Sequence, residues 1–273
     1  MARRNKSAVE RYHDRVASRY DLSYDDAYWQ WHDTLTWDHL KHYLPSDTNA
    51  PVLDLGCGTG KWAAKLIKSG YRVTCVDISH AMLERARIKI ENMGSLDRVH
   101  LHQADLMDLS ELPKSEFALA LALGDPIGCA EKPARALKEI RRRLLPDGVL
   151  VATFDNRLAA IEFHLQTGDA KALADFLRHG RTHWLTKARE EQFPVQTYTP
   201  NQLVSLVERA GFEVLDLIGK TVLPLRHYRA QLMEPTQRRA MARIEKSLCR
   251  DSAAMGRASH LQIVARPKSM APG

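Results

Sequence analysis

Short apolar runs alternate with amphipathic stretches along most of this chain. Between the runs, residues 61–69, 80–92 and 133–144 are predicted helices, and Gly94 stops the second of them. A Pro-Asp-Gly turn is expected at 146–148. Strands that alternate with helices at this spacing predict a parallel, doubly wound α/β sheet. The apolar runs, read as strands, are residues 52–55, 73–76, 98–102, 117–123 and 149–154.

The last third of the chain completes the same sheet. Thr199 and Pro200 open a helix that runs through Ala210, and residues 212–218 and 261–265 are predicted strands. The chain is therefore expected to form a seven-stranded, mostly parallel, Rossmann-like sheet. Its final two strands should form a hairpin-like antiparallel edge.

Three segments lie outside this alternating scheme. Residues 1–45 are expected to form a helical N-terminal cap, rich in tyrosine and tryptophan between Ser7 and Leu44. Residues 46–273 are expected to form the main domain, with helical insertions at about 157–195 and 220–257. Crossovers after parallel strands lie above the carboxyl edge of the sheet, where ligands bind, so these segments should select the substrate.

A glycine-rich turn follows the first predicted strand. Asp54 precedes Gly56, Gly58 and Gly60, and the next strand ends at Asp77, seventeen residues after the last of these glycines. Glycines allow positive φ and close approach of a ligand, and the helix N-terminus after them offers free N–H groups. An acidic residue at the tip of the following strand can accept both hydroxyls of a ribose. The unit is predicted to bind a nucleoside.

The spacing of the glycines separates two nucleoside-binding classes. Dinucleotide folds use G-x-G-x-x-G, whereas this chain has G-x-G-x-G preceded by an acidic residue. The stretch from Asp54 to Gly60, followed by Val-Asp-Ile at 76–78, resembles the first motifs of the class I S-adenosylmethionine-dependent methyltransferases. Residues 12–21 are similar to the leading helix of many small-molecule members. The resemblance covers residues 50–266 and implies S-adenosylmethionine as cofactor and S-adenosylhomocysteine as product.

The resemblance also assigns parts of the cofactor to positions in this chain. Asp77 should accept the ribose hydroxyls, Ile78 should pack on the adenine, and Asp105 should bind the adenine amino group beside the N–H of Leu106. The methionine end should lie against Gly56 and Gly58, with Asp54 directed towards its ammonium group. The predicted cofactor set is Tyr20, Asp54, Gly56, Cys57, Gly58, Gly60, Asp77, Ile78, Asp105, Leu106 and Leu123.

Composition and charge set limits on the protein's class. Apolar residues make up 44% of the 273 residues and charged residues 27%, which is ordinary for a soluble globular protein. No apolar stretch approaches the roughly 20 residues needed to cross a bilayer. The four cysteines are scattered without a C-x-x-C pair, so reduced thiols in a cytoplasm are expected, and no metal site. The net charge of +7 includes a basic cluster at 226–257, which suits a solvated helix face, an anionic substrate or RNA phosphates.

Methyl transfer needs a dedicated base only when the nucleophile arrives protonated. The side chains that could take that role are His13, His32, Asp125, His164, His183 and His227. The two selected as catalytic candidates are Asp125, at the end of the fourth strand, and His227 in the basic cluster. Asp125 lies in Gly-Asp-Pro-Ile-Gly at 124–128, so it is equally suited to shaping a tight turn. That run lacks the second proline and the aromatic residue of exocyclic base-amine methyltransferases.

The sequence therefore predicts a cytoplasmic methyltransferase that modifies oxygen, nitrogen or carbon of a small molecule, which the basic cluster would allow to be anionic. Nucleic acid and membrane are not expected partners. The alternatives are an RNA or protein methyltransferase that uses residues 226–257, a cofactor-binding protein without methyl transfer, and a dehydrogenase. The sequence leaves the acceptor and the oligomeric state open, a homodimer included.

Overall fold

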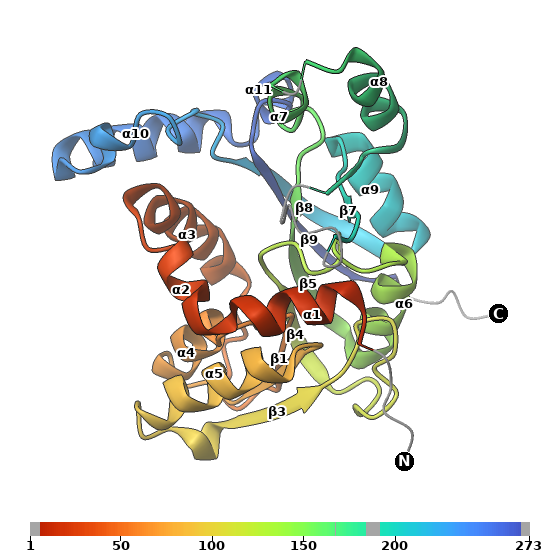
Figure 1. Cartoon of the computed structure of the whole chain (residues 1–273). Helices are drawn as coiled ribbons and strands as arrows, with labels where there is room; N and C mark the ends of the chain where they lie inside the picture. Colours follow the sequence, from red (N-terminus) through yellow and green to blue (C-terminus); the bar gives the residue numbers. More distant parts are fainter. Residues whose placement is uncertain (1–5, 167, 184–191, 269–273) are drawn as a thin grey trace.

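Seven strands form the central sheet of this protein, in the order β3-β2-β1-β4-β5-β9-β8. The computed structural model describes residues 6–166, 168–183 and 192–268 (Figure 1). Neighbouring strands from β3 to β5 are parallel, and β9 is antiparallel to both β5 and β8. The predicted doubly wound α/β sheet is confirmed. The strands are β1 Val52–Leu55, β2 Val73–Asp77, β3 Val99–Gln103, β4 Phe117–Ala122, β5 Leu144–Asp155, β8 Phe212–Lys220 and β9 His260–Pro267.

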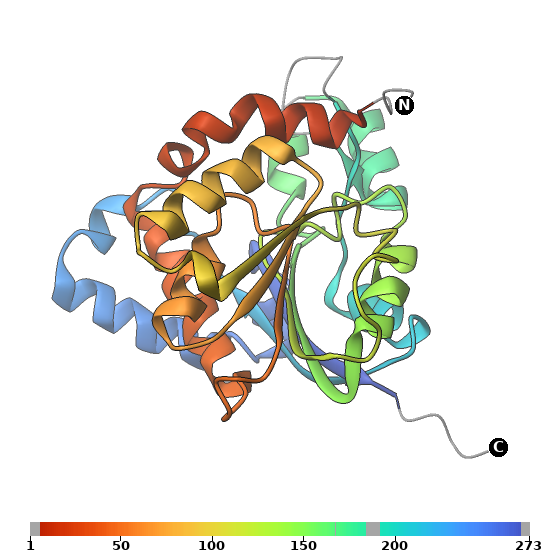
Figure 2. The same cartoon turned by 90° about the horizontal axis from the view of Figure 1, so that it is seen from below.

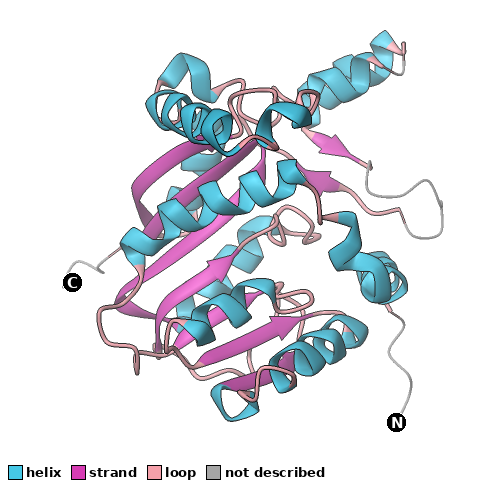
Figure 3. Cartoon of the chain, turned by 90° about the vertical axis from the view of Figure 1, so that its left-hand side faces the viewer, coloured by secondary structure: helices cyan, strands magenta, loops and turns pink. Residues whose placement is uncertain are grey.

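Helices cover both faces of the sheet. One face buries α6 and α9 against Leu53, Ala120 and Phe154, and the other buries α3, α4 and α5 against Val52 and Leu119. Figure 2 shows these two helical layers on opposite sides of the strands, and Figure 3 shows the strands as one twisted layer between them. The helices are α1 Ala8–Val16, α2 Tyr20–Ser23, α3 Ala27–Leu40, α4 Lys61–Lys68, α5 His80–Glu91, α6 Pro133–Arg143, α7 Ile161–Leu165, α8 Ala170–His179, α9 Pro200–Arg209, α10 Pro235–Leu248 and α11 Ser252–Met255.

Two details of the sheet differ from the sequence prediction. The predicted turn at 146–148 is wrong, because these residues lie inside the twelve-residue strand β5. They form an irregularity in its pairing with β4, and a Cβ on Gly148 would lie 2.7 Å from the carbonyl oxygen of Phe117. The last two strands, β8 and β9, do pair antiparallel. However, β9 lies between β5 and β8, so β8 is the edge strand on this side of the sheet and β3 is the edge strand on the other side.

The segments outside the alternating scheme hold the remaining helices. Residues 157–195 contain α7 and α8, and residues 184–191 of this stretch lie outside the described residues. After α8, β6 (Arg181–Thr182) and β7 (Val195–Gln196) pair as a second, two-stranded sheet, which the sequence analysis did not predict. The stretch between β8 and β9 contains α10 and α11, and Figure 1 shows α10 at the margin of the molecule. No helix in the described part of the chain is long and apolar enough to cross a membrane.

The cap helix α3 is held on the sheet by polar as well as apolar contacts. Tyr28 and Trp31 are buried beside Leu225 and Leu232, but His32, Thr36 and His39 are buried too. Lys220, at the end of β8, is 1% exposed. Its ammonium group donates to the hydroxyl of Thr36 at 2.7 Å and lies 3.2 Å from Nε2 of His32. Since buried polar groups need partners, this network fixes how α3 sits on β8 and β9.

The buried ammonium group of Lys220 should make stability depend on pH. Burial lowers the pKa of Lys220 to about 7, whereas an unfolded lysine titrates near ~10.4. The unfolded state therefore binds more protons between these values, and the free energy of unfolding rises as pH rises from about 7 towards 10. Lys220→Met should reduce this slope by up to about 1.4 kcal/mol per pH unit.

Urea unfolding at several pH values in that window measures the slope. Lys41→Met changes an exposed lysine, whose side chain is 48% accessible, and is the matched control. A Lys220→Met protein with the slope of the wild type would show that this burial does not govern the pH dependence.

Candidate cofactor site

The turn after β1 is fixed by hydrogen bonds to the neighbouring strand. The N–H groups of Gly56 and Cys57 both donate to the carbonyl oxygen of Val76, at 2.7 and 3.1 Å. Gly56 has a φ of +65°, and a Cβ there would lie 2.4 Å from Cβ of Pro126. Only glycine fits this position, because the loop after β4 packs directly onto it.

Asp77, the last residue of β2, connects two loops through one carboxylate. Its Oδ2 accepts the N–H of Gly58 at 2.8 Å, and its Oδ1 accepts the N–H of Ser79 at 2.9 Å. Burial raises the pKa of Asp77, and the charge of His13 and these two N–H donors oppose the rise. A carboxylate has about four acceptor sites, so both oxygens can accept a further hydrogen bond each. Asp77 lines the pocket described next, with those acceptor sites available to a ligand.

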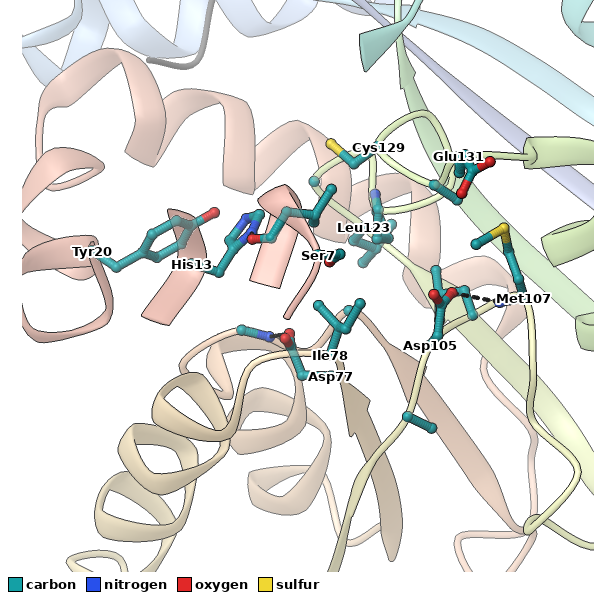
Figure 4. Close-up of a pocket in the computed structure, with 18 residues that line it drawn as sticks. Ser7, His13, Tyr20, Asp77, Ile78, Asp105, Met107, Leu123, Cys129 and Glu131 are labelled. Atoms are coloured by element: carbon teal, nitrogen blue, oxygen red, sulfur yellow. Dashed lines mark hydrogen bonds between the residues drawn. The ribbon is translucent and has the colours of Figure 1, made fainter. Parts of the chain in front are cut away.

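A cleft of about 890 Å³, measured out to its open mouth, lies at the carboxyl ends of the strands. In Figure 4, His13, Tyr20 and Cys129 lie on one side of it, and Asp77, Ile78 and Asp105 on the other. A ligand here would contact the strand ends on one side and the cap on the other.

Gly58 provides an open face of this cleft. Its φ is +54°, and a Cβ built there would meet no atom within 4 Å. Gly60 instead forms the N-cap of α4 with a φ of +77°, where a Cβ would lie 3.0 Å from Cβ of Ala86 in α5. Gly58 thus leaves room for a ligand, and Gly60 leaves room for a helix.

Most of the residues predicted to bind cofactor gather around the cleft. Asp105 lines it, with Oδ1 accepting the N–H of Met107 at 2.9 Å, which closes the turn after β3. Asp54, Cys57 and Gly60 are absent from the lining. The predicted residues that do line the cleft are Tyr20, Gly56, Gly58, Asp77, Ile78, Asp105, Leu106 and Leu123.

Asp54 lies in β1, directly before the glycine turn, and its side chain does not line the cleft. It is 1% exposed, burial raises the pKa of its carboxyl group to about 7, and its Oδ2 has no hydrogen-bond partner among the described residues. Buried acceptors are normally satisfied, by water if not by protein. This unpartnered oxygen beneath the glycine turn fits a bound molecule whose cationic group, or a water held by it, sits above the loop.

The structure also brings in residues that the sequence did not assign to the cofactor. Val9 and His13 come from α1, and Ser7 is the N-cap of this helix. Of these three, only His13 lies within residues 12–21, whose similarity to a leading helix could have indicated it. The others lie in the loops after β3 and β4, and the loop after β4 packs against the loop after β1. The additional lining residues are Ser7, Val9, His13, Ala104, Met107, Gly124, Pro126, Cys129, Ala130 and Glu131.

The two candidate bases lie elsewhere. Asp125 is 5% exposed and has a φ of +60°. Its Oδ1 accepts the N–H of Gly128 at 2.9 Å, and its Oδ2 accepts the N–H of Asp155 at 3.1 Å. The cleft lining does not include Asp125, so its visible role is to shape the turn. His227 is also outside the lining, with a side chain 57% exposed that pairs with Glu162 at 3.4 Å.

Two other titratable groups face the cleft near its cap. Burial raises the pKa of the Tyr20 hydroxyl and of the Cys129 thiol well above their usual ranges. Both groups are therefore neutral at physiological pH and are poor bases. Within the described ranges, no three histidine, cysteine or acidic residues gather where they could hold a metal ion.

Comparisons with known proteins agree with this geometry. A family model described as a methyltransferase domain matches residues 52–148. The demethylmenaquinone methyltransferase of Leptospira interrogans is 30% identical over 146 residues, covering 50% of this chain and 56% of the relative. The tRNA 5-carboxymethoxyuridine methyltransferase of Escherichia coli K12 is 23% identical over 264 residues, covering 94% of this chain and 96% of the relative.

A solved structure shares the fold over most of the chain. The S-adenosylmethionine-dependent methyltransferase of Mesorhizobium loti has a TM-score of 0.59 and 23% identity, with 84% of this chain and 96% of that chain covered. The chain spans between 29% and 56% of the length of the first curated relatives that it matches. Residues 52–148 of the chain thus match a methyltransferase domain, and the chain as a whole shares the fold of S-adenosylmethionine-dependent methyltransferases.

Proposed function

We propose that this protein transfers a methyl group from S-adenosylmethionine to a small molecule, at oxygen, nitrogen or carbon. The observation that carries the small-molecule proposal is the position of the cap across the cleft. Ser7, Val9, His13 and Tyr20 line the same cleft as the strand ends. An acceptor must therefore reach the reacting atoms past a helix, which a small molecule does more readily than a folded macromolecule.

The cap is tied to the cofactor loops at two points. Oδ1 of Asp14 accepts the hydroxyl of Ser79 at 2.6 Å and the N–H of Ala81 at 3.3 Å, at the N-terminus of α5. Asp21 accepts the hydroxyl of Thr59 in the glycine turn and pairs with Lys89 at 2.8 Å. These contacts would exclude water from the site and hold the cap in place during turnover.

The sulfonium of S-adenosylmethionine supplies an activated methyl group when the cofactor is bound. The chain's own residues then have to orient it. Asp77 would hold the ribose, Gly56 and Gly58 would hold the methionine end, and Leu123 and Tyr20 would border the reacting atoms. The main contribution of the protein is positioning and dehydration, for which rigid contacts matter more than a strong base.

An RNA acceptor is the second candidate, and two observations favour it. The tRNA methyltransferase relative matches nearly the whole chain, and α10 carries exposed cations. These cations, Arg238, Arg239, Arg243 and Lys246, lie on a helix at the margin of the molecule. An exposed basic helix face is also common without any nucleic-acid partner.

The four cysteines are free thiols, which supports a reducing cytoplasm as part of the proposal.

Labelled transfer to fractionated extract separates the two acceptors. The protein is incubated with methyl-labelled S-adenosylmethionine and a cell extract divided into small molecules, RNA and protein. The proposal expects label only in small molecules, because the cap restricts access to the cleft. Label in RNA that ribonuclease releases would replace this proposal with the second candidate. Cofactor binding without label in any fraction would identify a binding protein without methyl transfer.

Two glycines with similar backbones test the cofactor cradle. Gly58 and Gly94 have φ values of +54° and +65°, and neither Cβ would meet an atom within 4 Å. Alanine at either position should cost a similar ~1–2 kcal/mol of stability from its backbone alone. Gly58→Ala should also weaken S-adenosylhomocysteine binding at least about tenfold in calorimetry, because the methyl group enters the cleft. Equal cofactor affinity in both variants would contradict this placement of the ligand.

The candidate bases give a third test. His227→Ala should leave the rate of labelled transfer within about twofold, because its side chain is exposed and outside the cleft lining. Asp125→Asn should lower the free energy of unfolding by about 1–3 kcal/mol, since an amide accepts through one oxygen only. A large loss of rate in His227→Ala, at unchanged cofactor affinity, would restore a catalytic role for this residue.

A further inference from the structure

A row of aromatic side chains leads away from the cleft. It begins at Tyr20, which lines the cleft, and its ring centroid lies 4.8 Å from that of Tyr24. Tyr24 lies 4.9 Å from Trp29, and Trp29 lies 6.0 Å from His260. All four side chains, here called the aromatic row, are half-buried. They come from the cap and from the start of β9. Only Tyr20 is part of the cleft lining, and contacts between neighbouring rings connect the other three residues to it.

Arg226 lies over Trp29, the third residue of this row. Its guanidinium carbon is 5.8 Å from the centroid of Trp29 and 6.0 Å from that of Tyr28. The residue is exposed, and no hydrogen bond or ion pair to another described residue engages its guanidinium. Nearby arginines differ, because Arg229 pairs with Asp26 at 3.1 Å and Arg250 pairs with Asp216 at 2.6 Å. Arg226 therefore presents a planar donor fork that is free to bind an anion.

Arg226 interacts electrostatically with a carboxyl group at the end of β5. Asp155 is the acidic group that it influences, and the carboxyl group of Asp155 lies 3.5 Å from Nε2 of His260. Burial raises the pKa of Asp155 to about 6, while Arg226 and Lys220 oppose the rise. Two basic side chains thus act on one carboxyl group whose oxygen already faces an imidazole. An aromatic surface beside a cation suits a planar molecule that carries a negative group.

We propose that the aromatic row and Arg226 form the acceptor subsite, and that the acceptor is an aromatic carboxylic acid. Its ring system packs along Tyr24 and Trp29, and its carboxylate binds the guanidinium of Arg226. The atom that is methylated then lies at the Tyr20 end, two ring-to-ring steps from the carboxylate. This inference rests on the proposed function, because it names the acceptor class of the same site.

A matched pair of probes tests the role of charge. Calorimetry compares 1-naphthylacetate with 1-naphthylacetamide, which share shape but differ in charge, on protein saturated with S-adenosylhomocysteine. The acid should bind at least about tenfold more tightly than the amide. Arg226→Met should reduce this preference to about twofold or less. Arg238→Met, at an exposed arginine of α10, is the matched control and should keep the preference.

The outcomes separate this inference from the proposed function. Failure of S-adenosylhomocysteine to bind the wild-type protein overturns the proposed function. Normal cofactor binding with equal affinities for acid and amide, or with no saturable binding of the acid at millimolar concentration, overturns only the acceptor subsite. The same holds if Arg226→Met, with an unchanged unfolding midpoint, keeps the tenfold preference. Arg226-dependent binding of unfractionated tRNA without an acid preference would also overturn it.

Discussion

The cofactor site depends on the carboxylate of Asp77. Its two oxygens hold the N–H of Gly58 in the turn after β1 and the N–H of Ser79 at the start of α5. Ser79 in turn donates to Asp14 of the cap, so one carboxylate sets the positions of the glycine turn, the helix N-terminus and the covering helix. If the same carboxylate accepts the ribose hydroxyls, this binding role explains why an acidic residue occupies this strand end despite the free-energy cost of its burial.

Much of this fold could be predicted because the pattern of apolar residues along the sequence indicates which segments are buried. The central parallel strands β1 and β4 are buried on both faces and appear as continuous apolar runs. The position of β9 inside the sheet could not be read, because strand order is a tertiary property. The irregularity at 146–148 has the same cause, since Pro-Asp-Gly has the composition of a turn and only its pairing with β4 shows that it lies in a strand.

The site was predictable where a residue's role is local. Gly56, Gly58 and Asp77 follow from the strand-turn-helix pattern, and all three line the cleft. Asp125 was proposed from its place at the end of the fourth strand, and His227 from its residue type. In the structure, Asp125 binds two backbone N–H groups, and His227 faces solvent. The helices of the cap also have different roles, which its amino-acid composition does not indicate. Its α3 is fixed on the sheet by Lys220, whereas α1 covers the cleft.

The most direct test of the central claim changes the ligand and leaves the protein intact. Calorimetry on the wild-type chain compares S-adenosylhomocysteine with its 2′,3′-dideoxy analogue. If the Asp77 carboxylate accepts the ribose hydroxyls, the analogue loses charge-assisted hydrogen bonds and should bind at least about tenfold more weakly. Equal affinities would show that the carboxylate serves the loops alone, and that the ribose lies elsewhere in the cleft.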